Sequence, residues 1–248
     1  ATDAMMATFG PDVLLLQSLG VVRREVNVAW VPVSPPAVDL EPSDPAFGKK
    51  CYWQHERRNR RIKQLAERLR ASSPLDRRTF GEVASLFEQP GFVPPSITIL
   101  VDRPLHAVEL SRLLPGWPVI ADDDSLAEMD SRFCETVGQT RRQWSGGTHQ
   151  IVLASAAKQF RGEMTDVVIW AGGGTSNDAI PRSWFSTHDP IRKPLLIVDL
   201  LDEHNPTTQQ LSRDRRRAYL QRDIFPVEIS ASQGRLAMFL SRQKGGRR

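Results

Sequence analysis

Short apolar runs alternate with amphipathic stretches along the middle of the chain. Runs typical of buried strands lie at residues 96–102, 117–121, 149–155, 167–170 and 194–201. Stretches with the apolar spacing of helices lie between them at residues 106–114, 125–136 and 140–144. Strands that alternate with helices over short turns are typical of a parallel sheet with helices on both faces. The pattern therefore predicts an α/β fold.

Weaker signals flank this core. Further elements are predicted as strands at residues 26–33 and 227–229 and as helices at residues 52–69, 77–87, 208–224 and near 234–242. A proline-rich, acidic connector follows the first of these strands. We therefore expect an N-terminal segment or linker over residues 1–48 and one α/β domain over residues 49–248.

Positive charge is concentrated in two blocks. The net charge is only +4, and residues 1–48 carry two arginines against six acidic residues. The stretch from Lys49 to Arg78 is strongly basic, and a second arginine-rich block runs from Arg213 to Arg222. Two basic blocks on an otherwise balanced chain favour a polyanionic partner. The alternative is a pair of solvated helix faces.

Composition excludes several protein classes. Cys51 and Cys134 form no disulfide framework and no metal-ligand spacing with the five histidines. No apolar run reaches the roughly 18 residues that a membrane-spanning helix needs. The N-terminus lacks the basic region of a signal peptide and starts at Ala1, as a piece of a longer protein would. We expect a reduced, cytoplasmic protein with no metal site of its own.

Four segments along the chain carry distinctive combinations of strand, helix and loop residues. Residues 97–114 form a strand and a helix with an early His106-Ala step, and residues 133–155 form a helix, a turn and a strand. Residues 166–174 form a strand that ends in three glycines, and residues 195–204 form a strand that ends in Asp-Glu-His. In this order they resemble the C-terminal RecA-like domain of superfamily 2 DNA helicases of the restriction-subunit and repair type. Residues 9–13 and 55–62 resemble the segments that follow motif III and precede motif IV.

The resemblance implies a RecA-like parallel sheet of the P-loop NTPase type, with an N-terminal extension, in an ATP-dependent helicase. ATP and Mg²⁺ would be shared with a separate P-loop domain in the same or another chain, and the nucleic acid would be DNA, with RNA as the alternative. Arg182 and Arg192 would face the γ-phosphate. The implied nucleotide-binding residues are Gly172, Gly173 and Gly174. The implied nucleic-acid contacts are Ser155, Lys158, Arg103, Arg213, Arg216 and Arg217.

The chain also departs from the family pattern. Motif V should continue with an acidic residue, but the sequence there is Gln159-Phe160-Arg161. The segment at the position of motif VI, residues 180–187, contains a single basic residue, Arg182, which lies one place out of register with the family pattern. The phosphate-binding sequence Gly-x-x-x-x-Gly-Lys-Ser/Thr does not occur in the 248 residues.

Three functional hypotheses follow. The chain is one half of a motor, a non-catalytic module that binds nucleic acid or protein, or an independent enzyme on a Rossmann-like sheet. The third has little support because the fingerprint Gly-x-Gly-x-x-Gly is absent. Three single features have alternative interpretations. The three glycines would form a tight turn instead of a phosphate loop, and Asp202-Glu203 would be a magnesium-binding acid pair. The side chains of Trp144, Trp170 and Trp184 would either stack on bases or fill a core.

Overall fold

The computed structural model describes residues 22–24, 26–33, 35–37, 40–71, 95–129, 131–136, 138–140, 143, 146–159, 165–173, 180–187, 195–221 and 227–229. The predicted helices at residues 77–87 and 234–242 and the motif-like residues 9–13 lie outside this part of the chain. Arg192 and Gly174 also lie outside it.

An eight-stranded sheet forms the centre of the fold, and each strand runs parallel to its neighbours. Its order is β10 (Val227–Ile229), β2 (Val26–Pro32), β9 (Leu195–Leu201), β7 (Val167–Trp170), β3 (Ile97–Val101), β6 (His149–Leu153), β4 (Val119–Ala121) and β5 (Gly138–Thr140). A second, antiparallel sheet pairs β1 (Val22–Arg23) with β8 (Ser186–Thr187). The predicted α/β fold is confirmed, and the sheet is compatible with a RecA-like domain.

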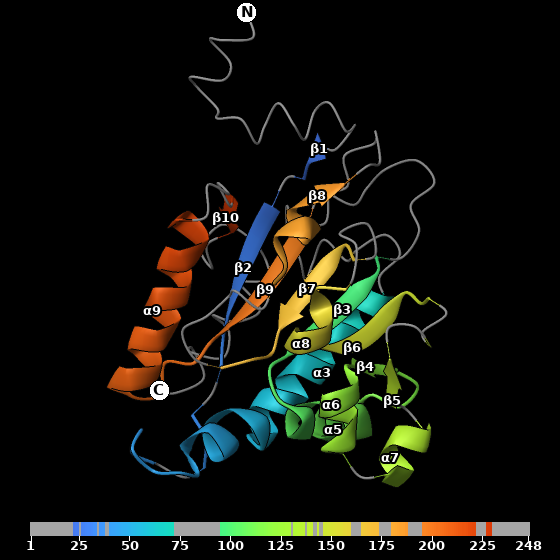
Figure 1. The fold of residues 1–248 in the computed structure, drawn as a ribbon. Coiled ribbons are helices and arrows are strands. Elements are labelled where there is room, and N and C mark those ends of the chain that lie inside the picture. The colour runs from blue at the N-terminus through green and yellow to red at the C-terminus, as the bar shows by residue number, and fades with distance from the viewer. Residues whose placement is uncertain are drawn as a thin grey trace, which may run out of the picture.

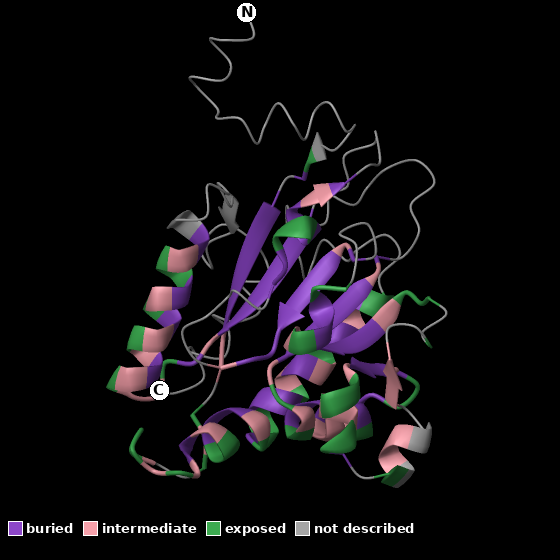
Figure 2. Cartoon of the chain, viewed as in Figure 1, coloured by how far each residue is buried: buried purple, intermediate pink, exposed green. Residues whose placement is uncertain are grey.

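Helices cover both faces of the large sheet (Figure 1). One face packs against α3 (Glu56–Ala71), α5 (Pro104–Leu113), α6 (Asp123–Ala127) and α7 (Ser131–Thr136). The other face packs against α8 (Ala154–Ala157), the 3₁₀-helix η4 (Arg182–Phe185) and α9 (Pro206–Gln221). The central strands are therefore buried on both sides, which explains their continuous apolar sequence (Figure 2).

The first strand of the sheet comes from the segment before residue 48. All seven residues of β2 pair with β9, and six of them are buried. The strand predicted at residues 26–33 is confirmed, and its one polar side chain, Asn27, is buried as well. Since β2 lies between β10 and β9, residues 26–32 are part of the same sheet as the rest of the domain.

Local structure differs from the prediction in three places. The helix expected at residues 125–136 is divided into α6 and α7. Thr140, predicted as the start of a helix at residues 140–144, belongs instead to the edge strand β5. This strand pairs with β4. A π-helix, η1 (Lys49–Trp53), precedes α3. None of the described helices is long and apolar enough to cross a membrane.

Candidate functional site

The carboxyl ends of the parallel strands meet at one edge of the sheet. The chain leaves β3 toward α5 on one face, whereas it leaves the neighbouring β6 toward α8 on the other face. Open α/β sheets bind ligands at such a change of direction. Arg103 follows β3, Ser155 and Lys158 belong to α8 and its C-terminal cap, and Gly172 and Gly173 follow β7. The sequence-predicted residues of these three segments therefore share one edge.

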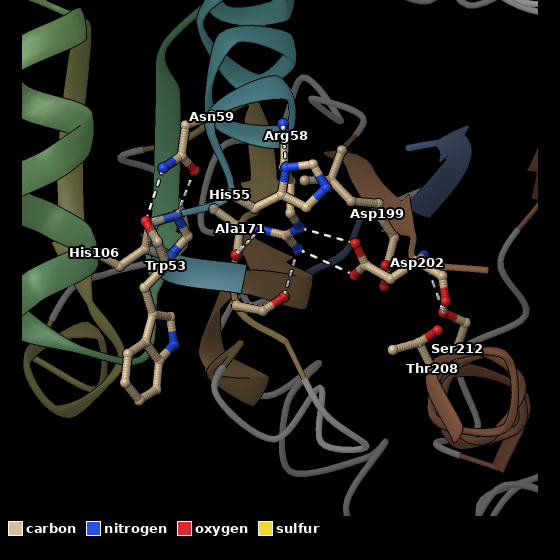
Figure 3. A network of polar contacts seen from close by, with 12 residues as sticks. Trp53, His55, Arg58, Asn59, His106, Ala171, Asp199, Asp202, Thr208 and Ser212 are labelled. Carbon is tan, nitrogen blue, oxygen red and sulfur yellow. Dashed lines mark hydrogen bonds and ion pairs between the residues drawn. The ribbon is translucent and has the colours of Figure 1, made fainter. Parts of the chain in front are cut away.

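A buried arginine connects the strand ends at this edge (Figure 3). The Nε of Arg58, on α3, donates to Asp202 Oδ1 over 2.9 Å, and its Nη2 lies 3.3 Å from Asp202 Oδ2. The same guanidinium donates to the carbonyl oxygens of Ala171 (2.5 Å) and Gly172 (3.0 Å). Both charged side chains are completely buried. Arg58 thus fixes α3 to the ends of β7 and β9.

A second arginine continues this network on the other face of the sheet. Arg215, on α9, binds Asp199 through its Nε (3.2 Å) and the Leu200 carbonyl through its Nη2 (2.7 Å). Its Nη2 lies 3.9 Å from Asp202 Oδ2, and Tyr219 donates its hydroxyl to Asp199. Burial alone would lower the pKa of Arg215, but Asp199 and Asp202 raise it above its ordinary value. Two arginines and two aspartates therefore form one buried, charge-balanced group.

Neutral side chains extend the network from α3 to α5. The amide nitrogen of Asn59 donates to the Trp53 carbonyl over 2.8 Å, and Asn59 Oδ1 lies 3.0 Å from His106 Nε2. Burial and the charge of Arg58 hold the pKa of His106 well below its ordinary value. His106 is therefore neutral at physiological pH and donates to Asn59 from Nε2. At the start of α3, the Arg58 amide donates to His55 Nδ1 over 3.2 Å, so His55 caps the helix.

The glycines after β7 are required by packing. A Cβ on Gly172 would lie 2.4 Å from the Trp170 ring, and a Cβ on Gly173 would lie 2.4 Å from the Tyr52 ring. Tyr52 is buried, and this burial, aided by Asp202, raises its pKa to about 12. The two glycines therefore let the chain pass close to two aromatic rings while Arg58 binds the carbonyl oxygens of Ala171 and Gly172.

Ser155 lies at the end of β6, in α8, where its hydroxyl donates to Asp122 Oδ2. Asp122 follows β4 and also accepts the backbone N–H (2.9 Å) and the hydroxyl (2.9 Å) of Ser125. Burial alone would raise the pKa of Asp122, but these hydrogen bonds lower it below its ordinary value. The Ser155 hydroxyl thus joins α8 to α6 and is already engaged by a carboxylate.

Some predicted residues lie elsewhere. Arg182 is exposed in η4. The carbonyl of the η4 residue Trp184 accepts from Arg24 (3.4 Å), which precedes β2 and also donates to the Thr165 carbonyl before β7 (2.7 Å). These contacts place η4 beside the amino ends of β2 and β7, whereas Gly172 follows the carboxyl end of β7. Arg182 is therefore not brought together with the glycine loop.

The arginine side chains of α9 point in two directions, some to solvent and one into the core. Arg213, Arg216 and Arg217 are exposed, whereas Arg215 is completely buried. The predicted nucleic-acid contacts on α9 thus form an outer surface.

Two of the three tryptophans considered for base stacking, Trp170 and Trp184, are buried in the core of this face. The third, Trp144, lies outside the described residues.

Sequence reasoning missed the residues that organise the edge, above all Arg58, Asn59 and Asp199. Arg58 was one of many arginines in a basic block, and nothing in the sequence distinguished it from Arg57. Asp202 had been weighed as a magnesium ligand, but its two oxygens face Arg58 and Arg215. Within the part of the chain that the structure describes, no three His, Cys, Asp or Glu side chains are grouped to hold a metal ion.

Comparison with known proteins does not add a family to these observations. No protein-family model matches the sequence, and no curated protein matches it.

Proposed function

We propose that this chain is the second RecA-like domain of an ATP-dependent DNA helicase or translocase. In this proposal it binds the backbone of a nucleic acid and completes an ATP cleft together with a separate P-loop domain, which supplies the phosphate cradle and the Mg²⁺ ligands. The chain itself contains no Gly-x-x-x-x-Gly-Lys-Ser/Thr sequence, so it does not hydrolyse ATP alone.

The observation that carries the proposal is the network around Arg58. Four helicase-like segments were recognised by their order along the chain: residues 55–62, 97–114, 166–174 and 195–204. Arg58 and Asn59 of the first segment contact His106 of the second, Ala171 and Gly172 of the third, and Asp202 of the fourth. A parallel sheet brings the ends of its strands to one edge, and the contacts of Arg58 and Asn59 add the first segment to the other three there, which supports the proposal.

A second candidate is a non-catalytic module of the same fold that binds nucleic acid or a protein. Two observations favour it. Arg182 belongs to η4, which lies beside the amino ends of β2 and β7, at the opposite edge of the sheet from the glycine loop. The glycine loop is itself closed by Trp170, Tyr52 and Arg58, so its close packing has a structural explanation. In this version the fold and the basic surfaces persist without a motor function.

ATP hydrolysis separates the two candidates. The 248-residue chain and the complete coding sequence that contains it are assayed in parallel, with and without single-stranded DNA. A motor half predicts no hydrolysis by the chain alone and DNA-stimulated hydrolysis by the complete protein. Loss of that stimulation in the Arg182→Ala variant would assign this arginine to the γ-phosphate. DNA binding without hydrolysis in either form supports the non-catalytic module, and hydrolysis by the chain alone contradicts both.

A further inference from the structure

Charge changes sign along the carboxyl edge of the sheet. One side, formed by η1 and the turn after β3, carries the exposed cationic side chains of Lys49, Lys50 and Arg103. At the end of β4, two strands away from β3, residues 122–128 carry four acidic side chains and no basic one. Adjacent strands lie about 4.8 Å apart, so the reversal takes place over roughly 10 Å. A long polyanion is therefore attracted to only one side of this edge.

The basic side contains a compact group that we call the η1 surface: Lys49, Lys50, Trp53 and Arg103. Lys49, Lys50 and Arg103 are exposed, and Trp53 is partly exposed. The guanidinium of Arg103 lies over the Trp53 ring, 5.6 Å from its centre. Asn59 in turn holds the Trp53 carbonyl (2.8 Å). The buried network thus supports the ring on which Arg103 rests, so less side-chain freedom is lost when this arginine binds a partner.

We infer that the η1 surface binds the phosphate backbone of a nucleic-acid strand, an inference that rests on the proposed function and adds Lys49, Lys50 and Trp53 to its contacts. A nucleic acid fits better than an acidic protein for a compositional reason. Protein interfaces have an apolar core, whereas nucleic-acid interfaces are polar and positively charged. Among the described residues Leu105 is the one large exposed hydrophobic side chain, and three of the four side chains of the η1 surface are cationic.

The acidic side limits the path of the strand. Asp123 and Asp124 are exposed at the start of α6, and Asp122 accepts the hydroxyl of Ser155. While it donates to Asp122, Ser155 presents only oxygen lone pairs to a phosphate, beside a carboxylate. The strand therefore follows the basic side, over η1 and Arg103, and does not cross the end of β4.

The test measures the affinity of the 248-residue chain and its variants for a fluorescently labelled oligodeoxythymidine at several salt concentrations. Lys49→Gln with Lys50→Gln is expected to weaken binding about tenfold and to reduce the slope of log affinity against log salt by about 1.4, because each phosphate contact on a single strand contributes about 0.7. Arg103→Gln alone is expected to weaken binding about threefold. Unchanged melting temperatures confirm that these exposed substitutions leave the fold intact.

Two controls make the comparison specific. Arg70→Gln with Arg112→Gln also removes two exposed positive charges, but from the C-terminal ends of α3 and α5, away from η1, and should leave the affinity within about twofold. Asp123→Asn with Asp124→Asn should not weaken binding. Equal losses in the two basic double variants would mean that net charge sets the affinity, and a loss confined to the Arg70 and Arg112 variant would move the surface to the C-terminal ends of α3 and α5. Either result overturns the inference but leaves DNA binding in place. Failure of the unsubstituted chain to bind DNA at low salt would overturn the proposed function as well.

Discussion

Arginines one residue apart on α3 and α9 have opposite surroundings. Arg57 is exposed, whereas Arg58 is completely buried against Asp202 and two carbonyl groups. On α9, Arg216 is exposed, whereas Arg215 is completely buried against Asp199. Each basic block of the sequence therefore contains an inward arginine that holds the fold together and outward arginines that face solvent or a ligand.

The difference shows why the charge of a block overstates its value for binding. Arg58 and Arg215 are neutralised by Asp202 and Asp199 inside the domain and contribute little to the field outside. Outward residues gain little from their own ion pairs, because exposed pairs such as Glu56–Arg60 contribute about 0.2–1 kcal/mol. Substitution in an inward pair should therefore lower the free energy of unfolding strongly, whereas substitution in an outward pair should change it little.

The largest effect is expected when a buried pair loses one partner. Asp202→Ala leaves Arg58 charged and buried without its carboxylate, which costs about 3–5 kcal/mol in the free energy of unfolding. The matched control is Glu56→Ala, which removes the acid from the exposed Glu56–Arg60 pair and should change stability by less than about 1 kcal/mol. Urea denaturation measures both. Similar losses in the two variants would remove the distinction between inward and outward pairs.

An intermediate effect is expected at the glycine loop that Arg58 holds. Gly173→Ala places a Cβ against the Tyr52 ring and should cost about 1–3 kcal/mol in stability. The cost should shrink when Tyr52→Leu removes the ring, so the double variant should be more stable than the sum of the single changes predicts. Urea denaturation of the four proteins in this cycle gives the coupling. Strict additivity would show that the ring does not require the glycine.

A smaller, pH-dependent effect is expected from His106. Its pKa is lowered in the folded protein, so the unfolded state binds the additional proton as the pH falls below the ordinary value of 6.5. Stability from this group is therefore fully present above that pH and declines below it, by about 1 kcal/mol between pH 7 and 5.5. His106→Gln keeps a hydrogen-bonding side chain beside Asn59 but does not titrate. An equal pH dependence in the two proteins would contradict a neutral, buried His106.

Periodicity predicted most of the fold because buried strands and amphipathic helices leave strong local patterns. Residues 97–101, 149–153, 167–170 and 195–201 are strands as predicted, and the helices α3, α5 and α9 lie where apolar spacing placed them. The short edge strand β5 was missed because its three residues carry no apolar pattern and their conformation depends on pairing with β4.

The organisation of the edge could not be predicted from local patterns. The Arg58–Asp202 contact joins residues 144 positions apart, and only the three-dimensional fold decides that Arg58 rather than Arg57 points inward. Predictions of chemistry had the same limit. Gly172 and Gly173 were predicted to bind nucleotide or to form a tight turn, whereas the aromatic rings that require glycine there come from Trp170 and from the distant Tyr52.

The most direct test of the account compares Arg58→Met with Arg57→Met. Both substitutions remove one positive charge from the first turns of the same helix, and methionine is a good helix former, so net charge and helix propensity change equally. The account predicts that Arg58→Met lowers the free energy of unfolding by about 3–5 kcal/mol, because Asp202 is left buried without its partner. It predicts a change within about 0.5 kcal/mol for Arg57→Met. Equal losses in the two variants would contradict the claim that one inward arginine holds the helicase-like segments together.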